Sequence, residues 1–340
     1  MKILYGVPTT GNGHINRSRL MIAALKAQGH SVTALFSGPK RPAFWSDASF
    51  ESCIELVGLT LATENGQVSY FKTALQAQPM KLLHDIRTID LRPYDLVFSD
   101  FEPISAYAAK RAKVTSIGLS NQAAHHYDIP KQNGYLLARG VMKYYAPAQH
   151  QLGLHWHHFS QPILPPIIDP SLSCSCEVQD DLILVYLPFE NRTEVLKLLQ
   201  ANKTHRFHLY SQVDAIEQHE NVLIHPFSRT HFIADLQRCS GVICQAGFEL
   251  PSEALHLGKK LLVKPVQNQY EQICNANTLL QNKLGQVMNQ LNPDSIAEFL
   301  HSAMPIARNY PNVSQAVAHW VSSADLNAPH ASMELVRKLW

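Results

Sequence analysis

The stretch that decides the fold is Gly241–Ala276, GVICQAGFELPSEALHLGKKLLVKPVQNQYEQICNA. Its apolar runs predict a strand at Gly241–Cys244, a helix that begins near Leu250, and a second strand at Lys260–Lys264. A strand, a helix and a strand at this spacing are typical of a parallel sheet with covering helices. The stretch therefore predicts a doubly wound α/β fold.

The turn between that first strand and the helix predicts a ligand site. It consists of the small residues Gln245-Ala246-Gly247, and Pro251 suits the first helical turn because it lacks an N–H group. Glycine lets a ligand come close to the backbone, and the free N–H groups at a helix start favour an anion. Glu253 is placed to accept two sugar hydroxyls. The sequence thus predicts a site for a phosphate and a ribose.

Strands and helices alternate in both halves of the chain. In the first half, the expected strands are Lys2–Val7, Ser31–Phe36, Asp95–Ser99 and Val114–Gly118. In the second half, they are Leu182–Leu187, Phe207–Ser211 and Val222–His225, followed by the two strands above. We expect two doubly wound, Rossmann-like domains that face one another across a cleft, with ligands at the carboxyl ends of the strands.

A proline-rich segment suggests where the domains divide. Residues 161–170, QPILPPIIDP, predict a stiff linker between an acceptor-side domain at 1–160 and a nucleotide-sugar domain at 171–322. Residues 323–340 predict a final helix that packs back on the first domain. A length of 340 residues suits two domains, each with its own core.

Composition excludes several classes of protein. The formal net charge of +2 argues against a nucleic-acid partner. The N-terminus lacks the apolar core of a signal peptide, and no apolar run reaches the roughly 20 residues of a membrane span. Six scattered cysteines predict reduced thiols in a cytoplasmic protein.

The loop after the first strand, Thr9–Arg17, offers a catalytic candidate. It fails as a dinucleotide fingerprint, because Asn16 stands at the third glycine position and no acid ends the second strand. His14 could take a proton from an attacking hydroxyl, or it could be a capping or packing residue. Asp100 could orient His14, or it could share the N-cap of the Pro103 helix with Glu102.

Two sequence islands resemble those of GT-B glycosyltransferases, in the branch that holds the peptidoglycan N-acetylglucosaminyltransferase and the UDP-glycosyltransferases. The first island is the GxGHxxR element at Gly11, Gly13, His14 and Arg17. The second is Gly241–Ala276, which ends in the acidic-Gln…Asn-Ala pattern of Glu271-Gln272 and Asn275-Ala276. The order and spacing of the two islands match the family.

The resemblance implies a role for each site residue. The diphosphate of a UDP-sugar would meet the backbone of Ala246, Gly247 and Phe248, and Gly13 would approach the phosphates. Glu253 would bind the ribose, and Phe227-Ser228 would enclose the base. The donor sugar would be held by Glu271 and Gln272. His14 would be the general base, assisted by Asp100. Members of this fold need no metal or other cofactor, since backbone amides offset the leaving diphosphate. Gln245 belongs to the donor site and replaces the glutamate of retaining relatives, which favours inversion.

Other functions stay open at this point. The favoured function is that of an inverting, metal-independent hexosyltransferase. The second candidate is a UDP-sugar hydrolase that uses the same histidine. An epimerase or a non-catalytic partner subunit comes third, although intact His14 and Glu253 argue for an enzyme. The turn Pro188–Asn191 departs from the glycine-rich loop of the peptidoglycan enzyme. The acceptor is an unidentified hydroxyl compound, with lipid-linked or cell-envelope glycans as candidates.

Two further patterns have a functional and a structural interpretation. Residues 134–154 mix apolar, tyrosine and basic residues, which suits weak peripheral contact with the inner face of a membrane or, as the favoured alternative, a packed helix. Three groups of histidine and cysteine suggest metal ligands, but none has the spacing of a closed four-ligand site, so we expect no metal. They are His125-His126, His155–His158 and Cys174–Cys176.

Overall fold

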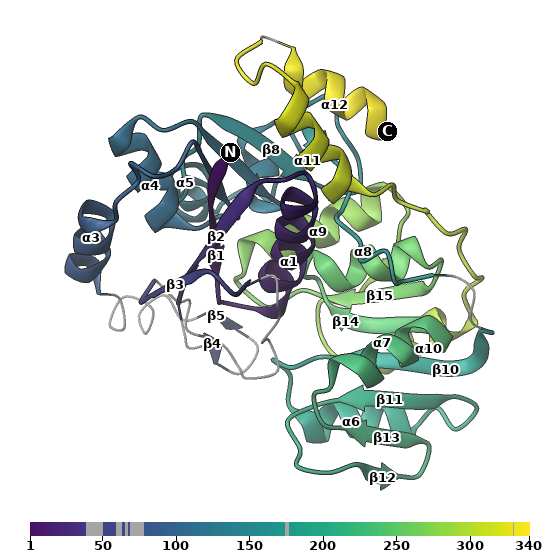
Figure 1. Cartoon of the computed structure of the whole chain (residues 1–340). Coiled ribbons are helices and arrows are strands. Elements are labelled where there is room, and N and C mark those ends of the chain that lie inside the picture. Colours follow the sequence, from purple (N-terminus) through teal and green to yellow (C-terminus); the bar gives the residue numbers. More distant parts are fainter. Residues whose placement is uncertain (39–49, 59–62, 65–66, 69–77, 174–176, 329) are drawn as a thin grey trace. The chain divides into compact units, whose positions relative to one another are not determined.

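The computed structural model describes residues 1–38, 50–58, 63–64, 67–68, 78–173, 177–328 and 330–340. The chain forms two compact units (Figure 1). The first contains Met1–Ala62, Tyr70–Asp169 and Tyr310–Trp340, and the second contains Thr63–Ser69 and Pro170–Asn309. Each unit is built on its own seven-stranded sheet.

The first unit holds a parallel sheet with strand order β3-β2-β1-β6-β7-β8-β9. Its strands are β1 (Lys2–Pro8), β2 (Ser31–Ser37), β3 (Cys53–Leu56), β6 (Leu96–Ser99), β7 (Ser116–Ser120), β8 (His150–Leu154) and β9 (Ile163–Leu164). Its helices are α1 (Asn12–Ala27), α3 (Pro79–Thr88), α4 (Pro103–Ala112), η3 (Gln122–His126), α5 (Leu136–Tyr144), α11 (Val313–Ser323) and α12 (Ala331–Leu339). These apolar runs form strands because both faces of a parallel sheet are covered.

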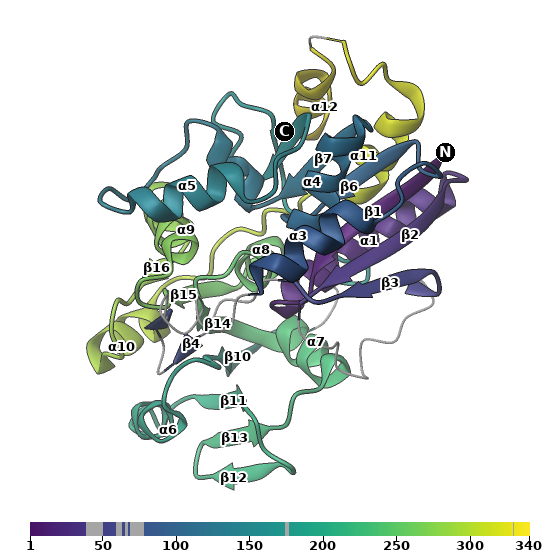
Figure 2. The ribbon, with the colours of Figure 1, turned by 90° about the vertical axis from the view of Figure 1, so that its left-hand side faces the viewer.

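Helices cover this first sheet through small and branched side chains. Ile104 and Ala108 of α4 pack on Leu4, Leu35 and Val97 of three adjacent strands. Figure 2 shows α3 and α4 beside these strands. Helix α1 contacts β1 and β2, and α11 packs on α1. The start of α1 therefore lies at the end of the central strand.

The second unit holds a sheet with strand order β12-β13-β11-β10-β14-β15-β16, in which only β12 runs antiparallel. Its strands are β10 (Gln179–Tyr186), β11 (Arg206–Tyr210), β12 (Glu217–His219), β13 (Val222–His225), β14 (Cys239–Gln245), β15 (Lys260–Lys264) and β16 (Gln286–Val287). Its helices are α6 (Arg192–Gln200), α7 (Arg229–Arg238), α8 (Glu249–His256), α9 (Tyr270–Gln281) and α10 (Pro293–His301). The short strands β4 (Thr63–Glu64) and β5 (Gln67–Val68) form a separate antiparallel pair.

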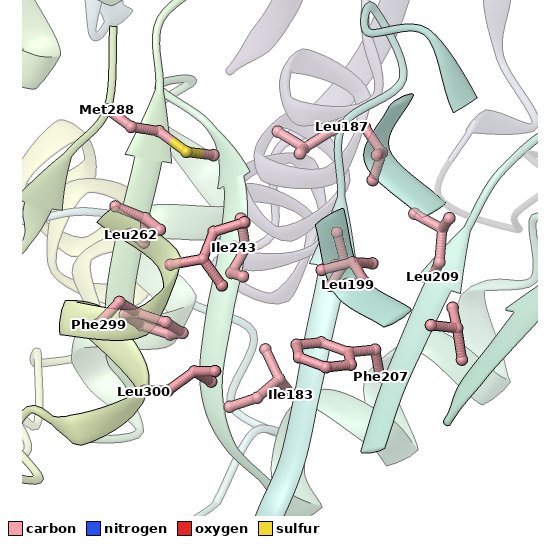
Figure 3. Packing of buried hydrophobic residues seen from close by; sticks show 14 of the residues in the cluster. Ile183, Leu187, Leu199, Phe207, Leu209, Ile243, Leu262, Met288, Phe299 and Leu300 are labelled. Atoms are coloured by element: carbon pink, nitrogen blue, oxygen red, sulfur yellow. The ribbon is translucent and has the colours of Figure 1, made fainter. Parts of the chain in front are cut away.

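One face of the second sheet carries a continuous apolar core (Figure 3). Ile183, Phe207 and Ile243 project from three neighbouring strands toward Leu199 of α6 and Phe299 of α10. Side chains alternate between the two faces of a strand, so their neighbours in sequence lie on the opposite face. That opposite face receives α7, and His208 and Tyr210 of β11 lie on it.

Both sheets have the strand order of a doubly wound fold. The chain order reverses between β1 and β6 in the first sheet and between β10 and β14 in the second. The loops that follow such a pair of strands diverge and leave a crevice at the carboxyl edge of the sheet. Each unit thus has one topological switch point where a ligand can bind.

The domain boundaries differ from those expected. The segment 161–170 is not a free linker, because β9 pairs with β8, Ile167 and Ile168 are buried, and Arg19 forms an ion pair of 2.5 Å with Asp169. The first unit therefore extends to Asp169. Helix α11 belongs to the first unit, so the chain returns to it at Tyr310 and not at residue 323.

The segment 134–154 forms a helix and a strand of the first unit. Its helix covers only Leu136–Tyr144, where it contacts η3 but has no fully buried residue, so it is a partly exposed surface helix. The segment then continues into β8. Within the described residues, no helix combines the length and the apolar character that a membrane span requires.

Candidate active site

Three side chains meet at the switch point of the first sheet. Asp100 follows β6, while His14 and Arg17 lie one turn apart at the start of α1. Arg17 donates from Nε to Asp100 Oδ2 over 2.8 Å and from Nη2 to Oδ1 over 2.6 Å. His14 Nδ1 lies 3.1 Å from Asp100 Oδ1. The predicted pair of His14 and Asp100 is therefore in contact, and Arg17 is a third member.

Burial makes this trio electrostatically strong. Asp100 is fully buried and Arg17 is 3% exposed, whereas the His14 side chain is 14% exposed. Burial alone would raise the pKa of Asp100, but the charges of Arg17 and His14 hold it below its usual value. Ser18 adds a hydroxyl donor 3.3 Å from Asp100 Oδ2. Asp100 is thus a carboxylate, and the more exposed His14 is the group that faces outward.

The tautomer of His14 depends on two competing partners of Nδ1. Arg17 Nη2 lies 2.7 Å from Nδ1 and can only donate, so this contact places the ring proton on Nε2. In the other tautomer, Nδ1–H donates to Asp100 and Nε2 is free to accept a proton. A base at His14 requires this second tautomer, in which Nδ1 does not accept from Arg17.

Asp100 is not the cap of helix α4. That role belongs to Glu102, whose Oε1 and Oε2 accept from the N–H groups of Ile104 and Ser105 over 2.9 and 2.6 Å. Gly6 makes room for this cap, because a Cβ at that position would collide with Ser105. The alternative of a shared cap was therefore wrong for Asp100, whose carboxylate turns to α1.

The predicted phosphate turn lies at the switch point of the second sheet. Ala246 and Gly247 connect β14 to α8, and no side chain caps the start of α8. A Cβ at Gly247 would meet no atom within 4 Å. The chain's own packing does not require glycine there, so the open space is available to a ligand beside the N–H groups of the first turn.

A buried ion pair ties together the strand ends around this turn. Lys264 Nζ donates to Glu190 Oε1 over 2.7 Å, and Gln245 Nε2 donates to the same oxygen over 2.9 Å. Lys264 is 4% exposed and Glu190 is 11% exposed. These residues follow or end β15, β10 and β14, so the pair fixes Gln245 at the centre of the carboxyl edge.

Helix α9 supports the same edge through amide side chains. Gln272 Oε1 accepts from the N–H of Val266 over 3.0 Å, and Asn275 Nδ2 donates to the carbonyl of Ala246 over 3.1 Å. Both side chains are buried, whereas Glu271 in the first turn is half-buried. Gln272 and Asn275 therefore hold the loops, and Glu271 is the more accessible of the two predicted sugar ligands.

Phe227 and Ser228 lie between β13 and α7. Phe227 is 48% exposed, and its ring packs edge-on against Tyr186, 6.0 Å away. Ser228 caps α7 by accepting from the N–H of His231. Glu253 is buried on α8. The predicted base, phosphate and ribose residues therefore come from the loop after β13, the turn after β14 and helix α8, all of them in the second unit.

Sequence reasoning missed three charged residues of these two edges. Arg17 is part of the GxGHxxR element, and its spacing of three from His14 places both on one helix face. Glu190 and Lys264 find each other across 74 residues, and no local pattern signals that pairing. A charged residue at the end of an otherwise apolar strand, such as Lys264, is the one sequence signal that indicates a buried ionic partner here.

Two of the three groups of histidine and cysteine lie within the described residues. His125 and His155 are buried, and burial lowers the pKa of each to about 3, so both are neutral. His157 and His158 stack on one another near Trp340. Cys174 and Cys176 lie outside the described residues. Among the described cysteines, the buried Cys239 and Cys244 are free thiols.

Comparison with known protein families shows to which family this chain belongs. Residues 1–305 match the profile described as glycosyl transferase family 1. The chain belongs to glycosyl transferase family 1. It is therefore a glycosyltransferase, and both switch points lie within the matched residues. No curated protein sequence matches the chain.

Solved structures place this family 1 member among glycosyltransferases of known fold. The spinosyn rhamnosyltransferase SpnG has a TM-score of 0.61 at 16% identity, over 100% of both chains. LpCGTa in complex with UDP has a TM-score of 0.61 at 12% identity, over 99% of this chain and 98% of that chain. SnogD from Streptomyces nogalater has a TM-score of 0.56 at 15% identity, over 100% and 95%.

At these identities the likeness shows the fold alone. The fold class expected from the sequence, two doubly wound α/β units of GT-B type, is confirmed. The general function, sugar transfer, is confirmed by the family. The branch of the peptidoglycan enzyme and the roles of individual residues remain predictions.

Proposed function

We propose that this family 1 member transfers a hexose from a UDP-sugar to a hydroxyl acceptor, with inversion at the anomeric carbon and without a metal. The observation that carries the proposal is the position of the predicted residues. His14 and Asp100 lie at the switch point of one doubly wound sheet, and Gln245, Ala246 and Gly247 at that of the other. Ligands of such sheets bind at these points.

The donor binds at the carboxyl edge of the second sheet. Its diphosphate meets the backbone of Ala246, Gly247 and Phe248 at the uncapped start of α8. Glu253 accepts the ribose hydroxyls, and the exposed ring of Phe227, beside Ser228, lies against the base. A UDP donor is supported by LpCGTa, which shares the fold and was solved with UDP.

The sugar and the phosphates have further partners in this proposal. Glu271 and the side-chain amide of Gln272 hold the donor sugar, and Gly13 approaches the phosphates from the first turn of α1. Backbone N–H groups and the helix dipole stabilise the negative charge of the leaving diphosphate, which is the task that a metal performs in other transferases.

The chemical step is a single displacement. His14 takes the proton of the acceptor hydroxyl at Nε2 while the acceptor oxygen bonds to the anomeric carbon and the bond to the diphosphate oxygen breaks. Asp100 then stabilises the imidazolium that forms. Gln245 offers no carboxylate for a covalent intermediate, and the nearby Glu190 is paired with Lys264. These features support inversion.

Calorimetric titration with UDP, GDP, dTDP and NAD in the absence of metal tests the donor site. We expect UDP to bind and NAD not to bind. Glu253→Ala is expected to weaken UDP binding by about 1–3 kcal/mol, because the ribose hydroxyls lose their acceptor. A lack of response to every nucleotide, or unchanged UDP affinity in the variant, would remove the basis of the donor assignment.

Incubation with UDP-sugars separates transfer from hydrolysis. An inverting transferase releases UDP in proportion to glycosylated acceptor, and NMR of the product shows the anomeric configuration opposite to that of the donor. Release of free sugar at the same rate with and without acceptor would instead establish the hydrolase, which uses water in place of the acceptor. Retention of configuration would contradict the single displacement.

We also propose that α5 makes a weak peripheral contact with an anionic membrane on the cytoplasmic face, where a lipid-linked or cell-envelope acceptor is presented. Leu136, Leu137 and Tyr144 are 77%, 90% and 62% exposed on this nine-residue helix. Arg139 and Lys143 on the same helix are also exposed. Apolar side chains flanked by basic ones suit the surface of an anionic bilayer.

Sedimentation with vesicles of anionic and of neutral lipid tests this contact. We expect the protein to bind anionic vesicles, and Leu137→Glu to lose most of that binding with unchanged thermal stability, because Leu137 is already 90% exposed. Ile306→Glu is the matched control, since Ile306 is 93% exposed in the second unit. Equal binding of wild type and Leu137→Glu would exclude α5 as the contact.

A further inference from the structure

The α7 face of the second sheet contains a cluster of ionisable side chains that the transfer reaction does not use. Phe207 and Leu209 of β11 point into the apolar core, so His208 and Tyr210 point to the opposite face. Tyr210 is paired in register with His225 of β13. Asp235 of α7 packs over this face. A doubly wound sheet normally fills such a position with apolar residues.

Asp235 is the centre of the cluster. Its Oδ2 lies 2.7 Å from His208 Nδ1 and accepts from the hydroxyl of Tyr210 over 2.7 Å, while Arg238 donates to Oδ1 over 3.0 Å. The ring centroids of His208 and His225 are 4.8 Å apart, and Tyr210 stacks on His225 at 5.0 Å. Three elements thus converge on one small volume.

His225 is the anomalous member. It is 8% exposed, and neither Nδ1 nor Nε2 has a hydrogen-bond partner in the protein. Buried polar groups nearly always have a partner, and an unpaired one points to a bound water or ion. Its ring lies beside His208 and Asp235, which are themselves metal-binding residue types. The unpaired nitrogens of His225 therefore indicate a ligand in this cluster.

We propose that His208, His225 and Asp235 bind a divalent transition-metal ion, of which Zn²⁺ fits best. One ligand atom from each residue lies within 4.8 Å of the others, and within the described part of the chain no other group of three or more His, Cys, Asp or Glu is placed in this way. Two imidazoles and one carboxylate suit a tetrahedral zinc ion whose fourth ligand is water.

Two of the three side chains, His225 and Asp235, are in the states that metal binding requires. Burial, followed by the charge of His208, lowers the pKa of His225, so its ring is neutral near pH 7. Burial alone would raise the pKa of Asp235, but the hydrogen bonds from His208 and Tyr210 lower it to about 2. The partial exposure of His208, 18%, leaves a route for the ion.

The ion would have a structural role that is separate from the transfer reaction. It would link β11, β13 and α7, whose first turn is capped by Ser228 beside the predicted base-binding Phe227. Three ligands from three elements replace contacts that an apolar core would supply. Metal binding is therefore expected to stabilise the second unit.

Titration of the tag-free, chelator-treated full chain with Co²⁺ and Zn²⁺ tests the site. We expect one Co²⁺ per chain, with the visible absorption of a tetrahedral ion, and its displacement by Zn²⁺. His225→Ala is expected to lower the affinity by at least about tenfold. His301→Ala, which removes an exposed histidine of α10, is the matched control and keeps the wild-type affinity.

A second variant keeps the test decisive if His225→Ala does not fold. Asp235→Asn preserves the shape of the side chain and removes the anionic ligand, so Zn²⁺ should no longer raise the melting temperature. The proposal is overturned if the wild-type chain takes up no stoichiometric Co²⁺ or Zn²⁺. It is also overturned if folded His225→Ala or Asp235→Asn binds the ion as tightly as wild type.

Discussion

Asp100 is the centre of the ionic contacts at the switch point of the first sheet. A fully buried carboxylate is costly to desolvate, and here its charge is offset by the bidentate contact from Arg17 and by His14. The same carboxylate has two tasks, because it holds Arg17 in place and also competes with it for His14 Nδ1. The chemistry of His14 is therefore set by two neighbours of opposite charge.

Removal of Arg17 should destabilise the protein in a pH-dependent manner. Arg17→Met leaves Asp100 buried without its main partner, which costs about 3–5 kcal/mol in the free energy of unfolding at pH 7. The folded pKa of Asp100 is lowered, so the stability it contributes is present above the unfolded pKa and is lost as pH falls through the folded one. Urea unfolding at pH 7 and pH 4 checks both points.

The pH 4 measurement is the more discriminating one. The difference between wild type and Arg17→Met should shrink there, because Asp100 of the variant then takes up a proton. The double variant Arg17→Met/Asp100→Asn should recover part of the loss at pH 7. A difference that is equal at both pH values, without recovery in the double variant, would mean that Arg17 acts only through packing.

His14→Ala should separate chemistry from binding. We expect the loss of nearly all turnover, since no other described side chain of the trio can accept a proton at neutral pH, while UDP affinity stays close to that of wild type. Asp100→Asn should slow turnover less, because the imidazole remains. Initial rates and calorimetry on the two variants check this. Parallel loss of turnover and UDP binding in His14→Ala would assign the residue a structural role.

At the scale of elements, the central strands were predictable and the edges were not. Val222–His225 and Lys260–Lys264 have the bounds read from the sequence, because an apolar run buried on both faces is recognisable locally. The two-residue strands β9 and β16 exist only because a neighbour pairs with them. Their sequences carry no periodic signal, so tertiary pairing decides them.

The same limit applies to the candidate site. Motif positions such as His14 and Gly247 could be read from the sequence, since each follows a recognisable strand. The bidentate contact of Arg17 with Asp100 spans 83 residues, and the cluster of His208, His225 and Asp235 spans three elements. The order of the strands in the sheet brings such ionic partners together. The sequence predicts the class of fold but not this order.

The pair of Lys264 and Glu190 binds the ends of β15, β10 and β14 into one edge. Lys264→Met removes the cation and leaves the Glu190 carboxylate beside the place proposed for the diphosphate. Like charges in contact cost several kcal/mol, so UDP affinity should fall by at least about tenfold. Calorimetry with UDP measures the change.

A matched double variant isolates the charge from the packing. Lys264→Met/Glu190→Gln removes both charges and keeps the amide contact to Gln245 feasible, so most of the lost UDP affinity should return. If the double variant binds UDP as weakly as Lys264→Met, repulsion by Glu190 is not the cause. Lys264 would then contact the donor directly.

At the scale of the whole molecule, the two units have separate sheets and separate cores. UDP should therefore stabilise the second unit selectively. When the free UDP concentration is about 100 times Kd, the free energy of the unfolding that exposes the core amides of this unit to exchange should rise by about 2.7 kcal/mol. Hydrogen exchange with and without UDP checks this, with β10 and β14 expected to gain protection. Equal gains in β1 and β6 would show that the two cores open together.

The division of the chain also sets an order of assembly. The first unit is discontinuous, since α11 and α12 follow the whole of Pro170–Asn309 in sequence yet pack on α1 and β9. On the ribosome, residues 170–309 emerge and can fold while the first sheet still lacks these two helices. The unit that begins first is thus completed last. Until then, the apolar surface of α1 that receives α11 is exposed to chaperones and proteases.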